Sequence, residues 1–162
     1  MEGESMKRKF PVRVLLLVSC FTLVFCLTGS LDTSAARVGK YSGKFSANDI
    51  QLMANAIYGE ARGEPYIGQV AIGAVILNRV ASPKFPNSIP GVIFEPGAFT
   101  AVSDGQIWLT PDATAKKAAM DAINGWDPVS GCLYYFNPAT ATSKWIWNRP
   151  QVKRIGKHIF CR

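Results

Sequence analysis

Residues 58–68 read Tyr-Gly-Glu-Ala-Arg-Gly-Glu-Pro-Tyr-Ile-Gly, and they separate two segments that have helical periodicity. Before this bend, apolar residues recur at three- and four-residue spacing, which predicts an amphipathic helix along Ile50, Met53, Ile57 and Ala61. Ser46 and Asp49 form a near capping box at its start. Pro65 suits the first turn of a second helix, which we expect to reach about Val80 and to be apolar on most sides. The stretch therefore predicts a helical core built on both sides of the bend.

The bend carries two acids, Glu60 and Glu64. Glu60 falls on the last turn of the first helix, where apolar neighbours can partly bury it and raise its pKa. Glu64 precedes Pro65, which disfavours helical geometry there, so the separation of the two carboxyl groups does not follow from their spacing. Cleavage of a glycosidic bond needs an acid that protonates the leaving oxygen. We expect Glu60 to be this acid and Glu64 to support it, by orienting Arg62 or a loop; a solvated surface role is the alternative.

The N-terminal segment has the pattern of a secretory signal. Four basic residues precede an apolar run from Val14 to Leu27, and small residues follow up to Ala36. The run is short for a membrane span, which needs about 20 apolar residues. We expect a signal over 1–36, a linker over 37–45 and a catalytic domain over 46–162; an uncleaved N-terminal anchor is the alternative. Either reading places the domain outside the cytoplasm.

Two cysteines, Cys132 and Cys161, remain after the signal. In an oxidising compartment they can form a disulfide that ties the C-terminus to the domain. Two free buried thiols are the alternative, and a metal site with His158 lacks a fourth ligand. We expect no metal and no cofactor.

The formal net charge of the chain is +7. Much of it lies in a C-terminal stretch without acids, at Lys144, Arg149, Lys153, Arg154, Lys157 and Arg162. Such a patch favours a polyanion. Outside the membrane, wall polymers fit better than nucleic acid, and a merely solvated surface is the alternative.

The rest of the chain predicts shorter elements. Prolines make residues 82–110 irregular, apart from a helical turn near 91–94. Asn78-Arg79, at the end of the second predicted helix, is either a solvated helix end or part of a site. Thr110 and Pro111 predict the N-cap and first residue of a helix that stops at Asn124-Gly125. Beyond it we expect a strand over 132–136, an extended segment over 144–147 and a hairpin over 151–161 that turns near Gly156.

Aromatic and hydroxyl side chains gather in the loop 97–108 and after residue 132. Long loops inside compact domains tend to carry function, and rings with hydroxyls suit the wall of a sugar site. We expect this wall to be built from Phe99, Thr100, Tyr135, Asn137 and Trp145. For Phe99 and Trp108, a role as core anchors is the alternative.

Several motifs in order resemble the spore cortex-lytic, germination-specific cell-wall hydrolases of the SleB type. The likeness rests on the segments Asn48–Arg79, Phe94–Phe99, Tyr134–Thr140, Trp145–Trp147 and Gly156–Cys161. It implies an α+β, lysozyme-like fold related to goose-type lysozymes and lytic transglycosylases, with a mainly helical core and a small C-terminal β region. It also implies cleavage between N-acetylmuramic acid and N-acetylglucosamine in spore cortex peptidoglycan, and the family's catalytic glutamate matches Glu60. Such proteins often carry an N-terminal peptidoglycan-binding domain, which we do not expect here.

Three functions stay open at this level. A lytic transglycosylase needs only Glu60, first as acid and then as base, because the sugar's own 6-hydroxyl closes on the anomeric carbon. A hydrolytic muramidase would use Glu60 with Glu64, and a wall-binding protein would use neither. We favour the transglycosylase, acting on glycan strands of the spore envelope and touching the membrane only through its N-terminal segment. The single histidine, His158, has no Ser/His/Asp partners, and export opposes ATP chemistry.

Overall fold

The computed structural model describes Tyr41 and residues 43–162, all of which belong to one compact unit, Arg37–Arg162. The expected signal and most of the expected linker lie outside the described residues. Tyr41 is buried and its ring contacts Phe45, which packs against the main core. The folded domain therefore includes the end of the expected linker. No helix among the described residues is long and apolar enough to cross a membrane.

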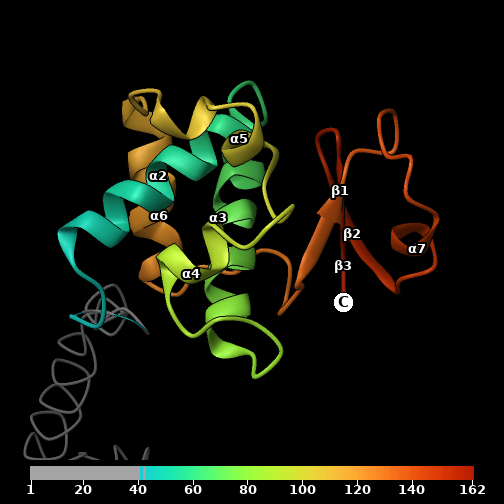
Figure 1. The fold of residues 1–162 in the computed structure, drawn as a ribbon, viewed down its shortest axis with the longest axis horizontal. Coiled ribbons are helices and arrows are strands. Elements are labelled where there is room, and N and C mark those ends of the chain that lie inside the picture. Colours follow the sequence, from blue (N-terminus) through green and yellow to red (C-terminus); the bar gives the residue numbers. More distant parts are fainter. Residues whose placement is uncertain (1–40, 42) are drawn as a thin grey trace, which may run out of the picture. The chain divides into compact units, whose positions relative to one another are not determined.

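Three helices form the helical body, α2 (Ala47–Ala61), α3 (Tyr66–Ala81) and α6 (Ala113–Ile123). The predicted capping box is present at the start of α2, where Ser46 and Asp49 bond each other's backbone N–H. α3 is buried along most of its length and packs against both other helices (Figure 1). Gly73 permits this approach, because a Cβ there would lie 3.0 Å from both Ala122 Cβ and Met53 Cε.

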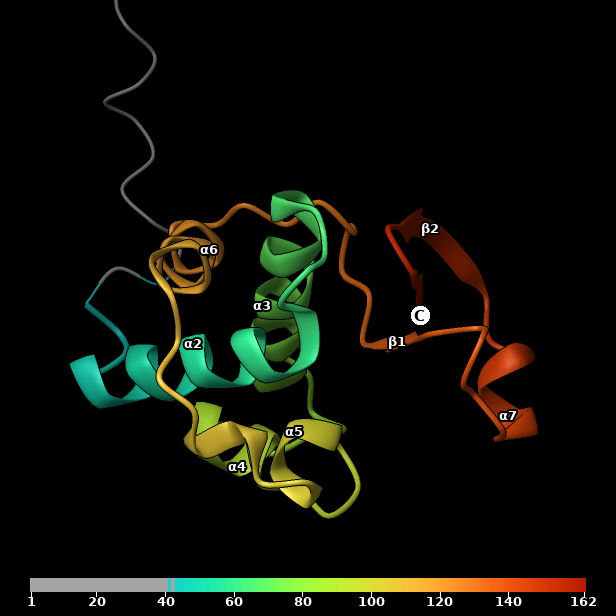
Figure 2. The same ribbon diagram turned by 90° about the horizontal axis from the view of Figure 1, so that it is seen from above.

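The chain between α3 and α6 forms three short elements, and these pack against α2 (Figure 2). They are α4 (Ile89–Ile93), α5 (Thr100–Ser103) and the 3-10 turn η2 (Gln106–Trp108). Ser88 caps α4 by accepting a hydrogen bond from the Gly91 N–H, and Pro90 occupies its first turn. This segment brings Thr100 and Gln106 close to the C-terminal end of α2.

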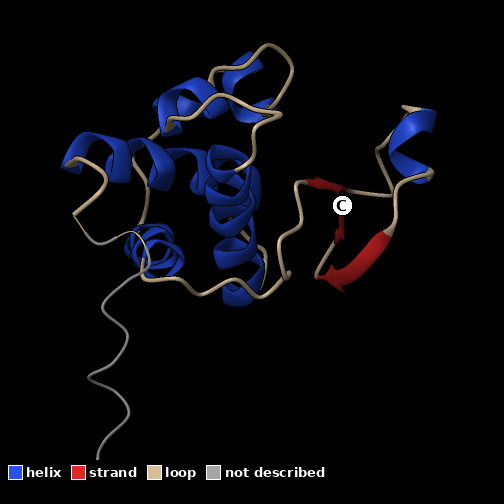
Figure 3. Cartoon of the chain, turned by 90° about the horizontal axis from the view of Figure 1, so that it is seen from below, coloured by secondary structure: helices blue, strands red, loops and turns tan. Residues whose placement is uncertain are grey.

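A three-stranded antiparallel sheet follows the helices (Figure 3). Its order is β1-β3-β2, from β1 (Tyr134–Phe136), β2 (Gln151–Ile155) and β3 (His158–Cys161). Tyr135 pairs with Phe160 across β1 and β3, and Gly156 forms the predicted hairpin turn with φ +55°. A helix-rich body with a small antiparallel sheet confirms the α+β class.

Two predicted details of the secondary structure are wrong. The N-cap of α6 is Asp112 and not Thr110, since the Asp112 carboxylate accepts the Ala115 N–H at 2.7 Å. The segment Lys144–Trp147, predicted to be extended, is the helical turn α7. Four residues are too few for periodicity to separate a strand from a helical turn. The turn buries Ile146 against Phe136 and Cys161, a contact that local sequence does not reveal.

Candidate active site

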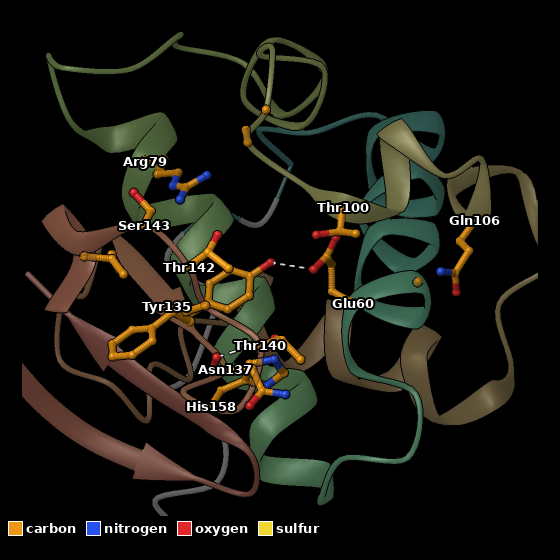
Figure 4. Close-up of a pocket in the computed structure, with 16 residues that line it drawn as sticks. Glu60, Arg79, Thr100, Gln106, Tyr135, Asn137, Thr140, Thr142, Ser143 and His158 are labelled. Carbon is orange, nitrogen blue, oxygen red and sulfur yellow. Dashed lines mark hydrogen bonds between the residues drawn. The ribbon is translucent and has the colours of Figure 1, made fainter.

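A cleft of about 650 Å³ lies between the helical body and the C-terminal sheet region. The helical side contributes Gly59, Glu60, Arg79, Thr100 and Gln106. The C-terminal side contributes Tyr135, Asn137, His158 and the segment 140–143 (Figure 4). Among the described residues that line the cleft, Glu60 is the only carboxylic acid.

Glu60 sits on the last turn of α2, where two donors hold its carboxyl group. The backbone N–H of Ala101 donates to Oε1 at 2.7 Å, and the Tyr135 hydroxyl donates to Oε2 at 3.0 Å. Figure 4 shows the Glu60 carboxyl and the Tyr135 hydroxyl pointing toward each other. Burial raises the pKa of Glu60; both hydrogen bonds act against this rise, and the charge of Asp104 adds to it. The group therefore keeps its proton to higher pH than an exposed glutamate.

Gly59 explains how Ala101 reaches the acid. A Cβ on Gly59 would lie 2.5 Å from Ala101 Cβ, closer than two non-bonded carbon atoms can approach. A glycine at this position therefore lets the start of α5 press against α2, next to the carboxyl group. The Tyr-Gly-Glu motif thus places the Glu60 carboxyl group and leaves room for the backbone that holds it.

Tyr135 connects β1 with the acid. Its ring contacts Phe99, Phe160 and the edge of His158, with centroid distances of 6.4, 6.0 and 5.3 Å. Burial, followed by the nearby charge of Glu60, raises the pKa of Tyr135 well above its usual value. The hydroxyl is therefore protonated at all working pH values and acts as a hydrogen-bond donor to Glu60.

Arg79 is the cation of the cleft. Its side chain is only 6% exposed, so the solvated helix end considered from sequence is wrong. Its Nε donates to the Leu133 carbonyl at 2.8 Å, and its guanidinium lies 5.2 Å from the ring centroids of both Phe85 and Phe99. Burial lowers the pKa of Arg79, although not enough to discharge a guanidinium at physiological pH.

The structure places the predicted wall residues in different environments. Thr100, Tyr135 and Asn137 line the cleft with Glu60. Asn137 also accepts the Ala139 N–H at 2.9 Å, a turn that presents the hydroxyl-rich segment 140–143 to the cleft. Phe99 does not line it, because the ring is 3% exposed and packs in the core.

The two remaining predicted residues lie outside the cleft. Trp145 is 52% exposed and lines a neighbouring hollow. Glu64 is not part of the lining either, because its Oε2 accepts the Lys157 N–H at 2.9 Å, next to the β2–β3 turn. This contact matches the loop-orienting role considered for Glu64, since it ties the bend after α2 to the hairpin.

Sequence reasoning missed His158 as a cleft residue. The sequence suggests for it only a metal ligand or the base of a Ser/His/Asp set. Among the described residues no three His, Cys, Asp or Glu side chains gather as a metal site. Burial lowers the pKa of His158, which favours the neutral ring beside Tyr135. The pairing of β1 with β3 would have indicated this position: Tyr135 pairs with Phe160, which brings His158 at the start of β3 close to the cleft.

Cys132 and Cys161 are free thiols in the structure, and both are buried. Burial raises the pKa of Cys132 to about 11. This is the second of the two alternatives that the sequence left open. Neither cysteine is among the residues that line the cleft.

An acid of raised pKa, set in a cleft with hydroxyl and amide side chains, defines the class of enzymes that cleave glycosidic bonds by proton donation. Residues 63–161 match the Cell Wall Hydrolase family, and the chain belongs to this family. The resemblance to its spore cortex-lytic members is confirmed by close relatives and solved structures.

The spore cortex-lytic enzyme of Bacillus cereus is 75% identical over 118 residues, which cover 73% of this chain and 46% of that protein. The enzyme of the same name from Bacillus subtilis is 73% identical over 119 residues, or 74% of this chain and 39% of that protein. The chain thus spans less than half the length of these relatives. The cell wall hydrolase CwlJ of Bacillus subtilis is 32% identical over 119 residues, which cover 69% of this chain and 83% of that protein.

Two solved structures match the described domain. The catalytic domain of Bacillus cereus SleB has 75% identity and a TM-score of 0.70, and the match covers 73% of this chain and 92% of that one. The catalytic domain of the germination-specific lytic transglycosylase SleB from Bacillus anthracis has 73% identity and a TM-score of 0.71, over 74% and 98% of the two chains.

Proposed function

We propose that this protein is an exported lytic transglycosylase with a lysozyme-like catalytic domain. It cleaves the bond between N-acetylmuramic acid and N-acetylglucosamine in spore cortex peptidoglycan during germination. The observation that carries the proposal is the single carboxyl group of the cleft, Glu60, held by two donors and with a raised pKa. The names of its close relatives, cortex-lytic enzyme and lytic transglycosylase, support the same substrate and reaction.

In the first step Glu60 acts as a general acid. Its proton goes to the glycosidic oxygen, and the bond from that oxygen to C1 of the muramic sugar breaks. Burial favours the reactant state, because it raises the pKa of Glu60 and so lets the carboxyl group keep its proton to higher pH. The carboxylate that forms receives the Ala101 N–H and the Tyr135 hydroxyl, and both bonds strengthen when their acceptor becomes charged.

In the second step Glu60 acts as a base. It takes the proton of the muramic 6-hydroxyl, whose oxygen forms a bond to C1 and closes an anhydro ring. Glu60 is then protonated again, and no water is consumed. The developing positive charge on the sugar lies next to the Glu60 carboxylate, which stabilises it through charge.

The arrangement of Glu64 supports this single-acid route over hydrolysis with two acids. Hydrolysis needs a second group that activates water at the anomeric carbon. Glu64 lies outside the cleft lining and accepts a hydrogen bond from Lys157. It acts on the shape of the site through the β2–β3 hairpin.

Mass spectrometry of digested cortex tests the reaction. Lytic transglycosylation predicts muropeptides with anhydromuramic ends, and reducing muramic ends would show hydrolysis instead. The Glu60→Gln variant is the inactive control, since the substitution keeps the shape of the side chain. A wall-binding protein without activity predicts no new ends with either form.

A further inference from the structure

A second hollow of about 240 Å³ adjoins the cleft and shares Arg79, Tyr135 and Ile146 with it. Glu95, Tyr134 and Trp145 line the hollow only. Its size is below the range of about 300–1,000 Å³ for pockets that hold drug-sized ligands. It therefore suits one sugar unit and not an oligosaccharide. Because the two cavities share walls, a glycan that occupies the cleft can continue into the hollow.

Glu95 lines the hollow and carries an unsatisfied hydrogen-bond acceptor. Its Oε2 is buried and has no hydrogen-bond partner among residues 41 and 43–162. A buried carboxylate oxygen without a donor is unfavourable, and native structures rarely keep one without reason. A ligand group with an N–H or O–H in the hollow would satisfy it.

Arg79 offers the complementary donors. Within the described part of the chain, its one side-chain hydrogen bond runs from Nε to Leu133, which leaves the two terminal nitrogens available. Arg79 and Glu95 line the same hollow. Burial lowers the pKa of Arg79, and the nearby groups Tyr135 and Glu95 oppose this lowering. Arg79 and Glu95 form no ion pair within 4.0 Å; the ion pair seen in the described chain joins Lys117 and Asp121. A neighbouring acid and cation that do not neutralise each other can bind one group carrying both a donor and an acceptor.

Two aromatic side chains, Tyr134 and Trp145, also line the hollow. The rings of Tyr134 and Trp145 meet edge to face at 5.5 Å. The Arg149 guanidinium lies 3.8 Å from the Tyr134 ring centroid and 5.0 Å from that of Trp145. Trp145 is nevertheless 52% exposed, which leaves ring surface available for a ligand. Pockets with an aromatic wall and a few placed polar groups are typical ligand sites.

We propose that the hollow binds an N-acetylhexosamine unit of the same glycan strand and reads its acetamido group. The amide N–H donates to Glu95, the amide carbonyl accepts from Arg79, and the sugar ring packs on Trp145. This inference rests on the proposed function and adds a recognition site beside the cleaved bond. It assigns Trp145 a sugar contact outside the main cleft, and it gives Glu95 a role in specificity.

Binding to an inactive form tests the site without depending on catalysis. Glu60→Gln is the background, and the probe is a long peptidoglycan glycan strand from which the peptide stems have been removed. Adding Glu95→Ala is expected to raise Kd about tenfold, the equivalent of one lost hydrogen bond. Adding Trp145→Ala removes the ring on which the sugar packs and is also expected to raise Kd about tenfold. Trp147→Ala is the matched control, because this residue lies on the same turn α7, is 43% exposed and does not line the hollow.

Removal of the acetyl groups separates the acetamido contact from general strand binding. A de-N-acetylated strand is expected to bind the Glu60→Gln form about tenfold more weakly, and Glu95→Ala should then add little. Equal Kd values for the Glu95→Ala, Trp145→Ala and Trp147→Ala forms would overturn the inference. An effect seen only on strands that keep their peptide stems would also overturn it, in favour of a peptide site. If Kd responds as expected but the wild-type protein forms no product, the proposed function fails and the binding site stands.

Discussion

The Glu60→Gln substitution tests the centre of the mechanism. Loss of a general acid lowers rates by roughly 10²–10⁴-fold, which corresponds to about 2.7–5.5 kcal/mol of transition-state stabilisation. We expect kcat on cortex fragments to fall within this range. The substitution removes the proton, the base and the carboxylate charge but keeps the shape, because the amide has nearly the same volume and the Ala101 N–H keeps an acceptor in Oε1.

The structure also predicts that this variant folds normally. The amide nitrogen replaces Oε2, the atom that accepts the Tyr135 hydroxyl. A tyrosine hydroxyl both donates and accepts, so it can turn and accept the new N–H. We therefore expect the free energy of unfolding in urea to change by less than about 1 kcal/mol, within the net worth of one hydrogen bond.

Glu64→Gln is the matched control for the same assay. Its Oε2 accepts a hydrogen bond from the Lys157 N–H outside the cleft, so the Glu64→Gln variant should retain most of the activity. Muropeptide release would be followed for the wild-type protein and both variants, with circular dichroism as the folding check. A folded Glu60→Gln protein with activity within a few-fold of wild type would refute the assignment of the acid. Equal losses in the two variants would refute the separation of their roles.

Three further predictions follow from individual contacts. Tyr135→Phe removes a hydrogen bond that lowers the pKa of Glu60, so the fall of kcat/KM with rising pH should move to higher pH; a shift to lower pH would contradict the mechanism. Gly73→Ala should lower the free energy of unfolding by about 1–3 kcal/mol in urea titrations, since the new Cβ meets Met53 at 3.0 Å; unchanged stability would show that the core relaxes around it. Peptide mapping should find Cys132 and Cys161 unlabelled by iodoacetamide in the folded protein at pH 8 and labelled after denaturation without reductant; failure to label then would reveal a disulfide.

Much of the helical body follows from local sequence. The capping box at Ser46, the proline at residue 65 and the glycine turn at residue 156 each specify backbone geometry through atoms of one or a few neighbouring residues. The same holds for the position of Glu60 on the last turn of α2, because helical periodicity reaches it without a break. Motif resemblance then indicated the family, which the comparisons confirm.

The surroundings of Glu60 depend on contacts between distant segments. Its two donors, Ala101 and Tyr135, lie 41 and 75 residues away along the chain, and no local pattern encodes such distances. For the same reason, local sequence did not decide between a wall role and a core role for Phe99, which packs in the core.

By itself, the sequence determined that the proposed acid, Glu60, stands on the last turn of α2, because capping and periodicity act between neighbours. Only the tertiary structure decided what that carboxyl group meets. Packing of α5 against Gly59 and the register of β1 against β3 place an N–H and a hydroxyl on its two oxygens. Packing also turns Glu64 to the hairpin, because its bond to Lys157 joins residues 93 positions apart. The helical position of Glu60 is thus local, and its environment is a product of long-range packing.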